Sequence, residues 1–321
     1  MTTLNTITLT TLGLCGALAL TLTGCDAPSF VDDDTRLRPD PPPWLLNTSK
    51  VLQSEVPGID PGEKYFMHTQ LSAEIIVDQQ PVTLDAIWVD GGELRGVLNG
   101  DEYGGDDFDG ARVHMLDESD PQEGPQLYDI VVEHELDEHD AHFYLLKYGD
   151  VGAPPEELSY MCAQDNAFDA IAEQSRMAYL MDGLRFESDD FEDDPGTMLF
   201  GCVSSAAGKA RKLGYNPDGA VSLNEFRAAV WAITASYCPE LGSNTTPGTE
   251  FMIYDTLGVG SSQGFGAVRR MEARWDENGA TCIGADHRGD AVLLPGAFQA
   301  CIAQLPTCTA ASPGFMATMS G

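Results

Sequence analysis

Six cysteines, all in the second half of the chain, limit the folds open to this sequence. They are the ones that remain once Cys15 and Cys25, near the N-terminus, are set aside: Cys162, Cys202, Cys238, Cys282, Cys301 and Cys308. An even number of cysteines in an exported chain predicts disulfides, and six cysteines allow about 15 pairings. The sequence has no Cys-x-x-Cys pair, which argues against a zinc knuckle or a thioredoxin-type site. We therefore expect a structural disulfide framework whose pairing the spacing leaves open.

The N-terminal segment predicts export. Residues 7–22 form an apolar run of 16 residues, which suits a secretory signal and is short for a membrane span. The run ends in Leu22-Thr-Gly-Cys25, which resembles a bacterial lipobox, in which the cysteine receives lipid. An ordinary signal peptide that contains a cysteine is the alternative. We expect a lipoprotein signal peptide at 1–24, lipidation of Cys25, and a chain anchored in the bacterial cell envelope, on the periplasmic or the outer-surface face.

The charge of the chain excludes several kinds of partner. Its 51 Asp and Glu residues outweigh 17 Lys and Arg residues, giving a formal net charge of −34. Such a surface repels nucleic acids and anionic lipid headgroups, so we expect no nucleic-acid partner and membrane contact only through the N-terminal lipid. Acidic runs such as Glu187–Asp194 are typical of a solvated surface. Weak binding of divalent cations and contact with a basic protein partner of the envelope are the alternatives.

Hydrophobic periodicity predicts an α+β fold, in which a β-rich N-terminal part packs with a disulfide-stapled mixed part that contains two short helices and a β-hairpin. The expected divisions after the signal peptide are an acidic, proline-containing tether at 25–62, the β-rich part at 63–150, the stapled part at 151–295 and a cysteine-containing tail at 296–321. In the β-rich part we expect strands at 73–78, 82–89 and 93–98 and a hairpin of 128–136 with 141–148.

The second half mixes helices and strands. The sequence predicts a helix from Cys202 to Leu213, which ends at Gly214, and a second helix that begins after a capping box, Ser222-Leu-Asn-Glu225, and ends at Cys238. A hairpin of 271–275 with 281–284 turns at 277–280, and a further strand lies at 251–254. A short helix is expected to begin at Pro295.

The second half resembles the ADYC domain, a family found mainly in exported and lipid-anchored proteins of myxobacteria. The stretches that carry the resemblance are Phe200-Gly-Cys-Val-Ser-Ser, Lys209-Ala-Arg-Lys-Leu-Gly-Tyr, Ala235-Ser-Tyr-Cys, Tyr254-Asp-Thr-Leu-Gly and Ala273-Arg-Trp-Asp-Glu-Asn-Gly-Ala-Thr-Cys. The resemblance covers residues 85–285 and is strongest at 200–282. It implies a fold and a location for the stapled part, and it brings no established activity.

Two departures from the family pattern concern single positions. Ser236 stands where the family has aspartate, and Ala210 and Ala229 stand where family members carry extra cysteines. The joint loss of two cysteines is what a discarded disulfide leaves behind. The resemblance therefore implies that the two alanines face each other across two helices.

One segment approaches the pattern of a calcium loop. In residues 214–225 the template places Asn216, Asp218, Ser222 and Glu225 at ligand positions, but Gly214 replaces the leading carboxylate. A glycine helix stop, a turn and a capping box explain the same residues. We favour the structural turn and no cofactor, and keep a calcium-dependent module as the alternative.

The histidines show no catalytic pattern. His134-Glu-Leu-Asp-Glu-His139 has one residue too many for a zincin helix, and a loose metal site that adds His142 is less favoured than a solvated hairpin tip. His114 and His287 are isolated in the sequence, and Ser-x-x-Lys does not occur. We therefore predict no catalytic residues and favour a non-catalytic binding or structural module over an exported hydrolase with an unrecognised site.

Overall fold

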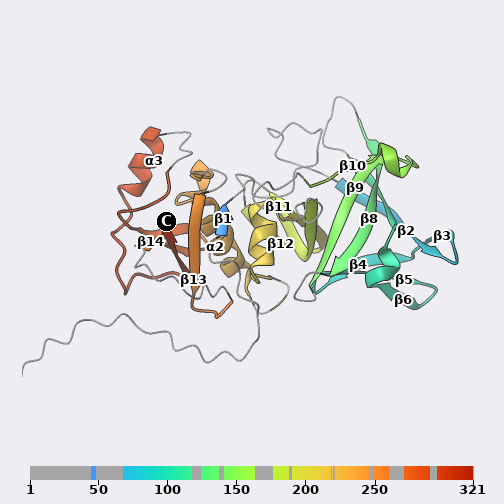
Figure 1. Ribbon diagram of the computed structural model, residues 1–321, viewed down its shortest axis with the longest axis horizontal. Helices are drawn as coiled ribbons and strands as arrows, with labels where there is room; N and C mark the ends of the chain where they lie inside the picture. Colours follow the sequence, from blue (N-terminus) through green and yellow to red (C-terminus); the bar gives the residue numbers. More distant parts are fainter. Residues whose placement is uncertain are drawn as a thin grey trace, which may run out of the picture. The chain divides into compact units, whose positions relative to one another are not determined.

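The computed structural model describes residues 45–47, 68–117, 124–136, 141–162, 176–187, 190–217, 219, 221–245, 249–259, 271–289 and 295–320. These residues form three antiparallel sheets and three α-helices, which confirms the predicted α+β class (Figure 1). The described residues all belong to one compact unit. The expected signal peptide and Cys25 lie outside the described residues.

The largest sheet has eight strands. They run in the order β12-β11-β9-β8-β7-β2-β3, with β10 paired to β9. Their bounds are β2 His68–Val77, β3 Gln80–Thr83, β7 Arg112–Asp117, β8 Gln126–Leu136, β9 His142–Asp150, β10 Ser159–Tyr160, β11 Met177–Glu187 and β12 Asp190–Cys202. The predicted hairpin is confirmed, because β8 pairs with β9 and places Ile130 opposite Tyr148. The sheet continues from β9 into β11 and β12, so the division expected at residues 150–151 falls inside it.

A smaller sheet interrupts the large one in the sequence. It consists of β4 Ala86–Asp90, β5 Glu93–Leu98 and β6 Asp101–Gly104, in that order. The single strand expected at 82–89 is therefore wrong: it is divided between β3 of the large sheet and β4 of the small one. The chain turns at Leu84, which is buried, and at Asp85, whose Oδ2 accepts a hydrogen bond from the backbone N–H of Asn99.

The third sheet has five strands and collects segments from distant parts of the chain. Its order is β1-β13-β16-β14-β15, with bounds β1 Leu45–Asn47, β13 Thr249–Asp255, β14 Met271–Asp276, β15 Gly279–Ile283 and β16 Met316–Ser320. The predicted β14–β15 hairpin is confirmed. Two segments are placed by long-range pairing alone: β1, in the expected tether, pairs with β13, and β16, in the expected tail, lies between β13 and β14.

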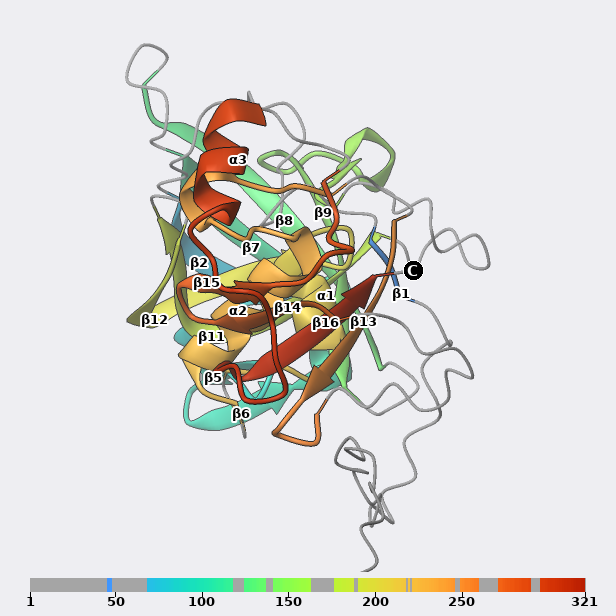
Figure 2. The same ribbon diagram turned by 90° about the vertical axis from the view of Figure 1, so that its left-hand side faces the viewer.

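The three helices are α1 Ala206–Lys212, α2 Leu223–Thr234 and α3 Pro295–Ile302. The expected start of α1 at Cys202 is wrong, because Cys202 is still part of β12 and the helix begins after Ser205, whose Oγ accepts a hydrogen bond from the N–H of Gly208. That hydrogen bond satisfies one of the free donors of the first turn. In Figure 2, α2 lies beside β14, which it contacts.

The predicted capping box of α2 is confirmed. Ser222 Oγ accepts from the N–H of Glu225, and the Glu225 carboxylate accepts from the N–H of Ser222. The expected end at Cys238 is wrong, because the helix ends at Thr234. Ala235 follows with a φ of +52°, a left-handed conformation that stops the helix.

Two large hydrophobic clusters hold these elements together. One lies between the large and the small sheet and includes Ile75, Phe108, Ile130 and Tyr144. The other surrounds α2 and includes Trp231, Trp275 and Phe226, together with Ala210 and Ala229, which are both fully buried. None of the helices among the described residues is long and apolar enough to cross a membrane.

Candidate functional site

A pair of histidines lies on the β8–β9 hairpin. His134 pairs with Tyr144 and His142 pairs with Leu136, so the two histidines are diagonal neighbours on one face of the sheet. Nε2 of His134 lies 2.9 Å from Nδ1 of His142. The side chain of His134 is only 3% exposed, although we expected a solvated hairpin tip. His139, the other histidine of this segment, lies outside the described residues.

Two carboxylates from earlier in the chain approach this pair. Asp106 belongs to a short 3₁₀-helix, Gly105–Phe108, and its Oδ1 lies 2.9 Å from Nδ1 of His134. Glu93, the first residue of β5, reaches the same place. A Cβ atom built on Gly105 would lie 3.5 Å from Oε1 of Glu93 and 3.7 Å from Cε1 of His134. The cluster therefore joins residues of β5, β8, β9 and the 3₁₀-helix.

Asp106, His134 and His142 form a hydrogen-bonded chain with a defined direction. A carboxylate beside Nδ1 of His134 favours the tautomer that carries its proton there, which leaves Nε2 to accept the Nδ1–H of His142. Burial lowers the pKa of His142, and the negative charge of Glu93 opposes that shift. A neutral imidazole is the form in which histidine binds metal ions or relays a proton.

The sequence contained only part of the information needed to find this cluster. The loose metal site considered from the sequence combined His142 with His134 and His139, whereas the observed hairpin register brings His134 and His142 to one face. Nothing local links Asp106 or Glu93 to the hairpin, because their approach depends on how the small sheet packs against the large one.

A second histidine, His114, is not isolated as the sequence suggested. Its Nδ1 lies 2.6 Å from Oδ1 of Asp129, which is fully buried. Oδ2 of Asp129 accepts from Arg112 at 3.0 Å and from the N–H of Gly152 at 2.9 Å. Burial by itself would raise the pKa of Asp129, but the hydrogen bonds from Gly152, His114 and Arg112 outweigh it and lower that pKa. The cluster ties β7 and β8 to the turn after β9.

The residues of the predicted calcium loop serve the local fold. Asn216 accepts the N–H of Gly219 through its backbone oxygen, which forms a turn. Ser222 Oγ lies 2.9 Å from Oε2 of Glu225, and both side chains belong to the capping box described above. Asp218 lies outside the described residues. The turn and the capping box are confirmed, and calcium binding stays a prediction.

All six candidate cysteines are paired. The disulfides are Cys162–Cys202, Cys238–Cys301 and Cys282–Cys308, with Cα–Cα distances of 5.5, 6.7 and 4.9 Å. The first joins Cys162, which follows β10, to the end of β12 in the large sheet. The second joins the segment after α2 to α3, and the third joins β15 to the C-terminal segment. The expected disulfide framework is therefore present, and its pairing is one of the combinations that the sequence left open.

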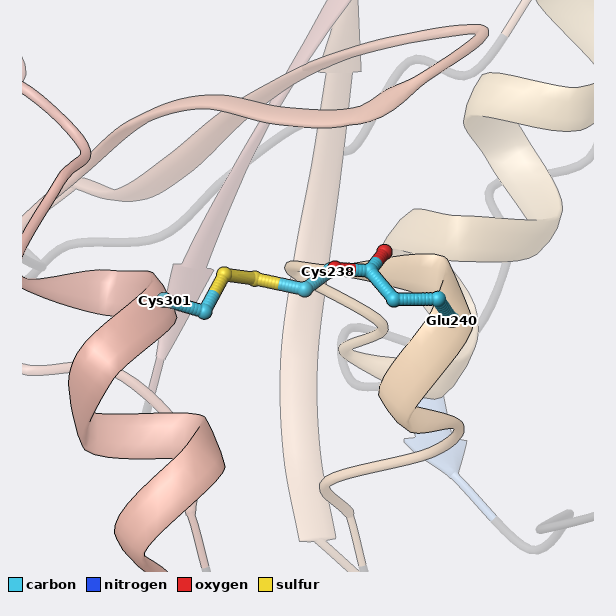
Figure 3. Close-up of side chains that lie close together, drawn as sticks. All are labelled: Cys238, Glu240 and Cys301. Atoms are coloured by element: carbon cyan, nitrogen blue, oxygen red, sulfur yellow. A yellow bond between two sulfur atoms is a disulfide. The ribbon is translucent and has the colours of Figure 1, made fainter.

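Figure 3 shows the one cluster among the described residues in which three donor groups of metal-ligating type lie within 4.8 Å of one another: Cys238, Glu240 and Cys301. Because the two cysteines form a disulfide, neither sulfur is available as a thiolate ligand. The carboxylate of Glu240 disfavours a thiolate at either sulfur, because two negative charges repel. A redox-active cysteine needs the opposite, a positive neighbour. The cluster therefore fits a structural disulfide.

The segment Ala235-Ser-Tyr-Cys238 is built into the core. The Tyr237 hydroxyl donates to Oε1 of Glu272 on β14, and Nε of Arg288 donates to the same oxygen at 2.7 Å. Arg288 also donates from Nη1 to the backbone oxygen of Ile233 at 3.0 Å, which satisfies a free carbonyl at the end of α2. Glu272 is fully buried and Arg288 is 4% exposed. Sequence inspection missed this ion pair because its members lie 16 residues apart on segments with no shared pattern.

Burial also determines the electrostatics of this segment. Burial would raise the pKa of Glu272, but the charge of Arg288 and the hydrogen bonds to the carboxylate outweigh it and lower that pKa. Burial raises the pKa of Tyr237 well above its usual range, so the hydroxyl stays a donor. Ser236 Oγ lies 2.8 Å from Oγ1 of Thr234, and both residues are buried. Serine in place of the family's aspartate thus adds a neutral group to this part of the core.

The fold and the cysteines define a class of protein: an α+β domain held by three disulfides, which indicates a location outside the cytoplasm. The chain belongs to the ADYC domain family, whose model matches residues 105–289. The predicted family is confirmed, and the matched range begins later than the stretch of 85–285 read from the sequence. A search of curated proteins and a search of solved structures each returned no match.

Proposed function

We propose that this chain is a lipid-anchored protein of the bacterial cell envelope whose ADYC domain is a non-catalytic binding or structural module. The apolar run at 7–22 and the cysteine that follows Leu22-Thr-Gly support the anchor. The disulfides support the compartment, because such bonds persist in oxidising environments.

The non-catalytic assignment depends on one observation. The polar side chains of the segment that defines the family are used by the fold itself. Tyr237 and Arg288 both donate to Oε1 of Glu272, Arg288 also donates to the end of α2, and Cys238 is joined to Cys301. Catalytic groups must reach a substrate, whereas these groups are buried.

The anchor is tested by cell fractionation of the Cys25→Ser variant. We expect the variant to leave the membrane fraction, because a serine cannot carry the thioether-linked lipid. Cys15→Ser is the matched control, since it makes the same substitution inside the apolar run and should leave the protein in the membrane fraction. Retention of Cys25→Ser in membranes would contradict the anchor.

The module is tested by intact-cell cross-linking of the anchored protein, compared with a Tyr237→Phe variant. A structural role for Tyr237 predicts that the variant is less stable but keeps the cross-linking pattern of the folded domain at low temperature. Loss of a specific reaction or ligand without loss of stability would instead place Tyr237 in a functional site.

A further inference from the structure

The histidine pair on the β8–β9 hairpin has the spacing of two ligands of one metal ion. Zinc–imidazole bonds are about 2.0–2.1 Å long, so two imidazole nitrogens on the same ion are about 2.9 Å apart at a right angle and about 3.3 Å apart at the tetrahedral angle that zinc prefers. Nε2 of His134 and Nδ1 of His142 are 2.9 Å apart. A metal ion can therefore replace the proton that the two nitrogens share once the nitrogens separate by a few tenths of an ångström and both rings turn their lone pairs toward the ion.

Asp106 completes a pattern that is typical of metal sites. A ligating histidine usually donates its second N–H to a carboxylate, which holds the tautomer and the ring orientation and makes the ligating nitrogen more basic. Oδ1 of Asp106 lies 2.9 Å from Nδ1 of His134, so the lone pair of Nε2 points toward His142. Tyr144 contacts the same ring, with the ring centroids 5.4 Å apart.

We propose that His134 and His142 bind a transition-metal ion such as Zn²⁺ through Nε2 and Nδ1, with Asp106 as the residue that orients His134. The two imidazoles supply the protein ligands, and solvent completes the coordination of the ion.

The ligand types select the class of ion. Imidazole nitrogens suit Zn²⁺, Ni²⁺ and Cu²⁺, whereas Ca²⁺ and Mg²⁺ prefer oxygen ligands in larger numbers. This distinction matters for a chain with a net charge of −34, which attracts every divalent cation diffusely. A specific site must bind Zn²⁺ in the presence of excess Mg²⁺. The proposal does not depend on the lipid anchor.

The test is calorimetric titration of the purified full chain with Zn²⁺ in excess Mg²⁺. We expect one saturable site, and we expect Asp106→Asn to weaken it about 10-fold, the lower end of the effect of removing a carboxylate that orients a ligand. The matched control is Asp107→Asn, which removes the same charge from the same 3₁₀-helix and should leave the affinity unchanged. Asp106 is 99% exposed, so its substitution leaves the core intact.

A second variant tests the ligands directly. His142→Ala should abolish the site, whereas His114→Gln, a histidine substitution in the same sheet, should keep it; the melting temperature of each variant shows that it is folded. The proposal is overturned if Mg²⁺ displaces the bound Zn²⁺, if Asp106→Asn and Asp107→Asn weaken binding equally, or if His142→Ala binds as the wild type does.

Discussion

The buried ion pair at the end of α2 gives the sharpest test of how this domain is held together. Arg288→Met removes a guanidinium that is 4% exposed and leaves Glu272, which is fully buried, without its counter-charge. It also removes the donor at 3.0 Å from the backbone oxygen of Ile233. Methionine keeps part of the packing against Phe251, whose ring lies 4.6 Å from the guanidinium carbon. The electrostatic loss therefore dominates the effect on stability.

Removing one partner of a buried ion pair costs about 3–5 kcal/mol. We expect Arg288→Met to lower the free energy of unfolding by about 4 kcal/mol, which for a urea slope of about 3 kcal/mol/M lowers the unfolding midpoint by roughly 1.3 M. The measurement is urea unfolding at neutral pH with the disulfides intact. Adding Glu272→Gln should restore part of the loss, because the double variant no longer buries an unpaired charge.

The matched control is Arg274→Met, on the same strand as Glu272. Arg274 is half-buried and donates to the backbone oxygen of Ala310 at 3.1 Å. Removing such a hydrogen bond costs about 1 kcal/mol. If Arg288→Met is no more destabilising than Arg274→Met, or if Glu272→Gln worsens it, the ion pair does not have the role assigned to it.

Three further outcomes are expected. Replacing Cys282 and Cys308 together by alanine should lower stability by about 3.5 kcal/mol, because their separation of 26 residues sets the loop entropy that the disulfide removes; an unchanged urea midpoint would contradict this. Asp129→Asn should destabilise the protein at pH 7 and should make no difference at strongly acidic pH. The pKa of Asp129 is lowered in the folded protein, so its carboxylate contributes stability above the unfolded pKa of about 3.9, and this contribution is lost as the pH falls through the folded pKa. Equal free energies of unfolding for the variant and the wild type at pH 7 would refute this expectation. At constant ionic strength Ca²⁺ and Mg²⁺ should shift the melting temperature equally, because the side chains of Ser222 and Glu225 are engaged in the capping box. A saturable shift with Ca²⁺ alone would support a calcium loop.

Local chemistry made several elements predictable. The capping box of Ser222 and Glu225, the β8–β9 hairpin and the β14–β15 hairpin are specified by residues within a few positions of one another. The cysteine count and the export signal together predicted disulfides, because paired cysteines are stable in an oxidising compartment. Each of these inferences uses information that is close together in the chain.

The errors arose where a distant contact outweighs a local pattern. The helix that begins after the Ser222–Glu225 capping box was predicted to continue to Cys238. The helix instead ends at Thr234, and Ala235 takes a left-handed conformation that carries Tyr237 to Glu272 on β14. This turn brings the Tyr237 hydroxyl to the buried carboxylate that also pairs with Arg288, a contact between distant segments that the local pattern does not encode.

By itself, the sequence determined the class of fold, the family, the set of disulfide cysteines and the local signals that begin helices and turn hairpins. Only the tertiary structure decided which cysteines pair, where β1 and β16 join the five-stranded sheet, and that Asp106 meets His134 and His142. The physical reason is that side-chain periodicity and capping act over a few residues. Disulfides, strand partners and hydrogen-bonded clusters instead join atoms whose proximity depends on the packing of the whole domain.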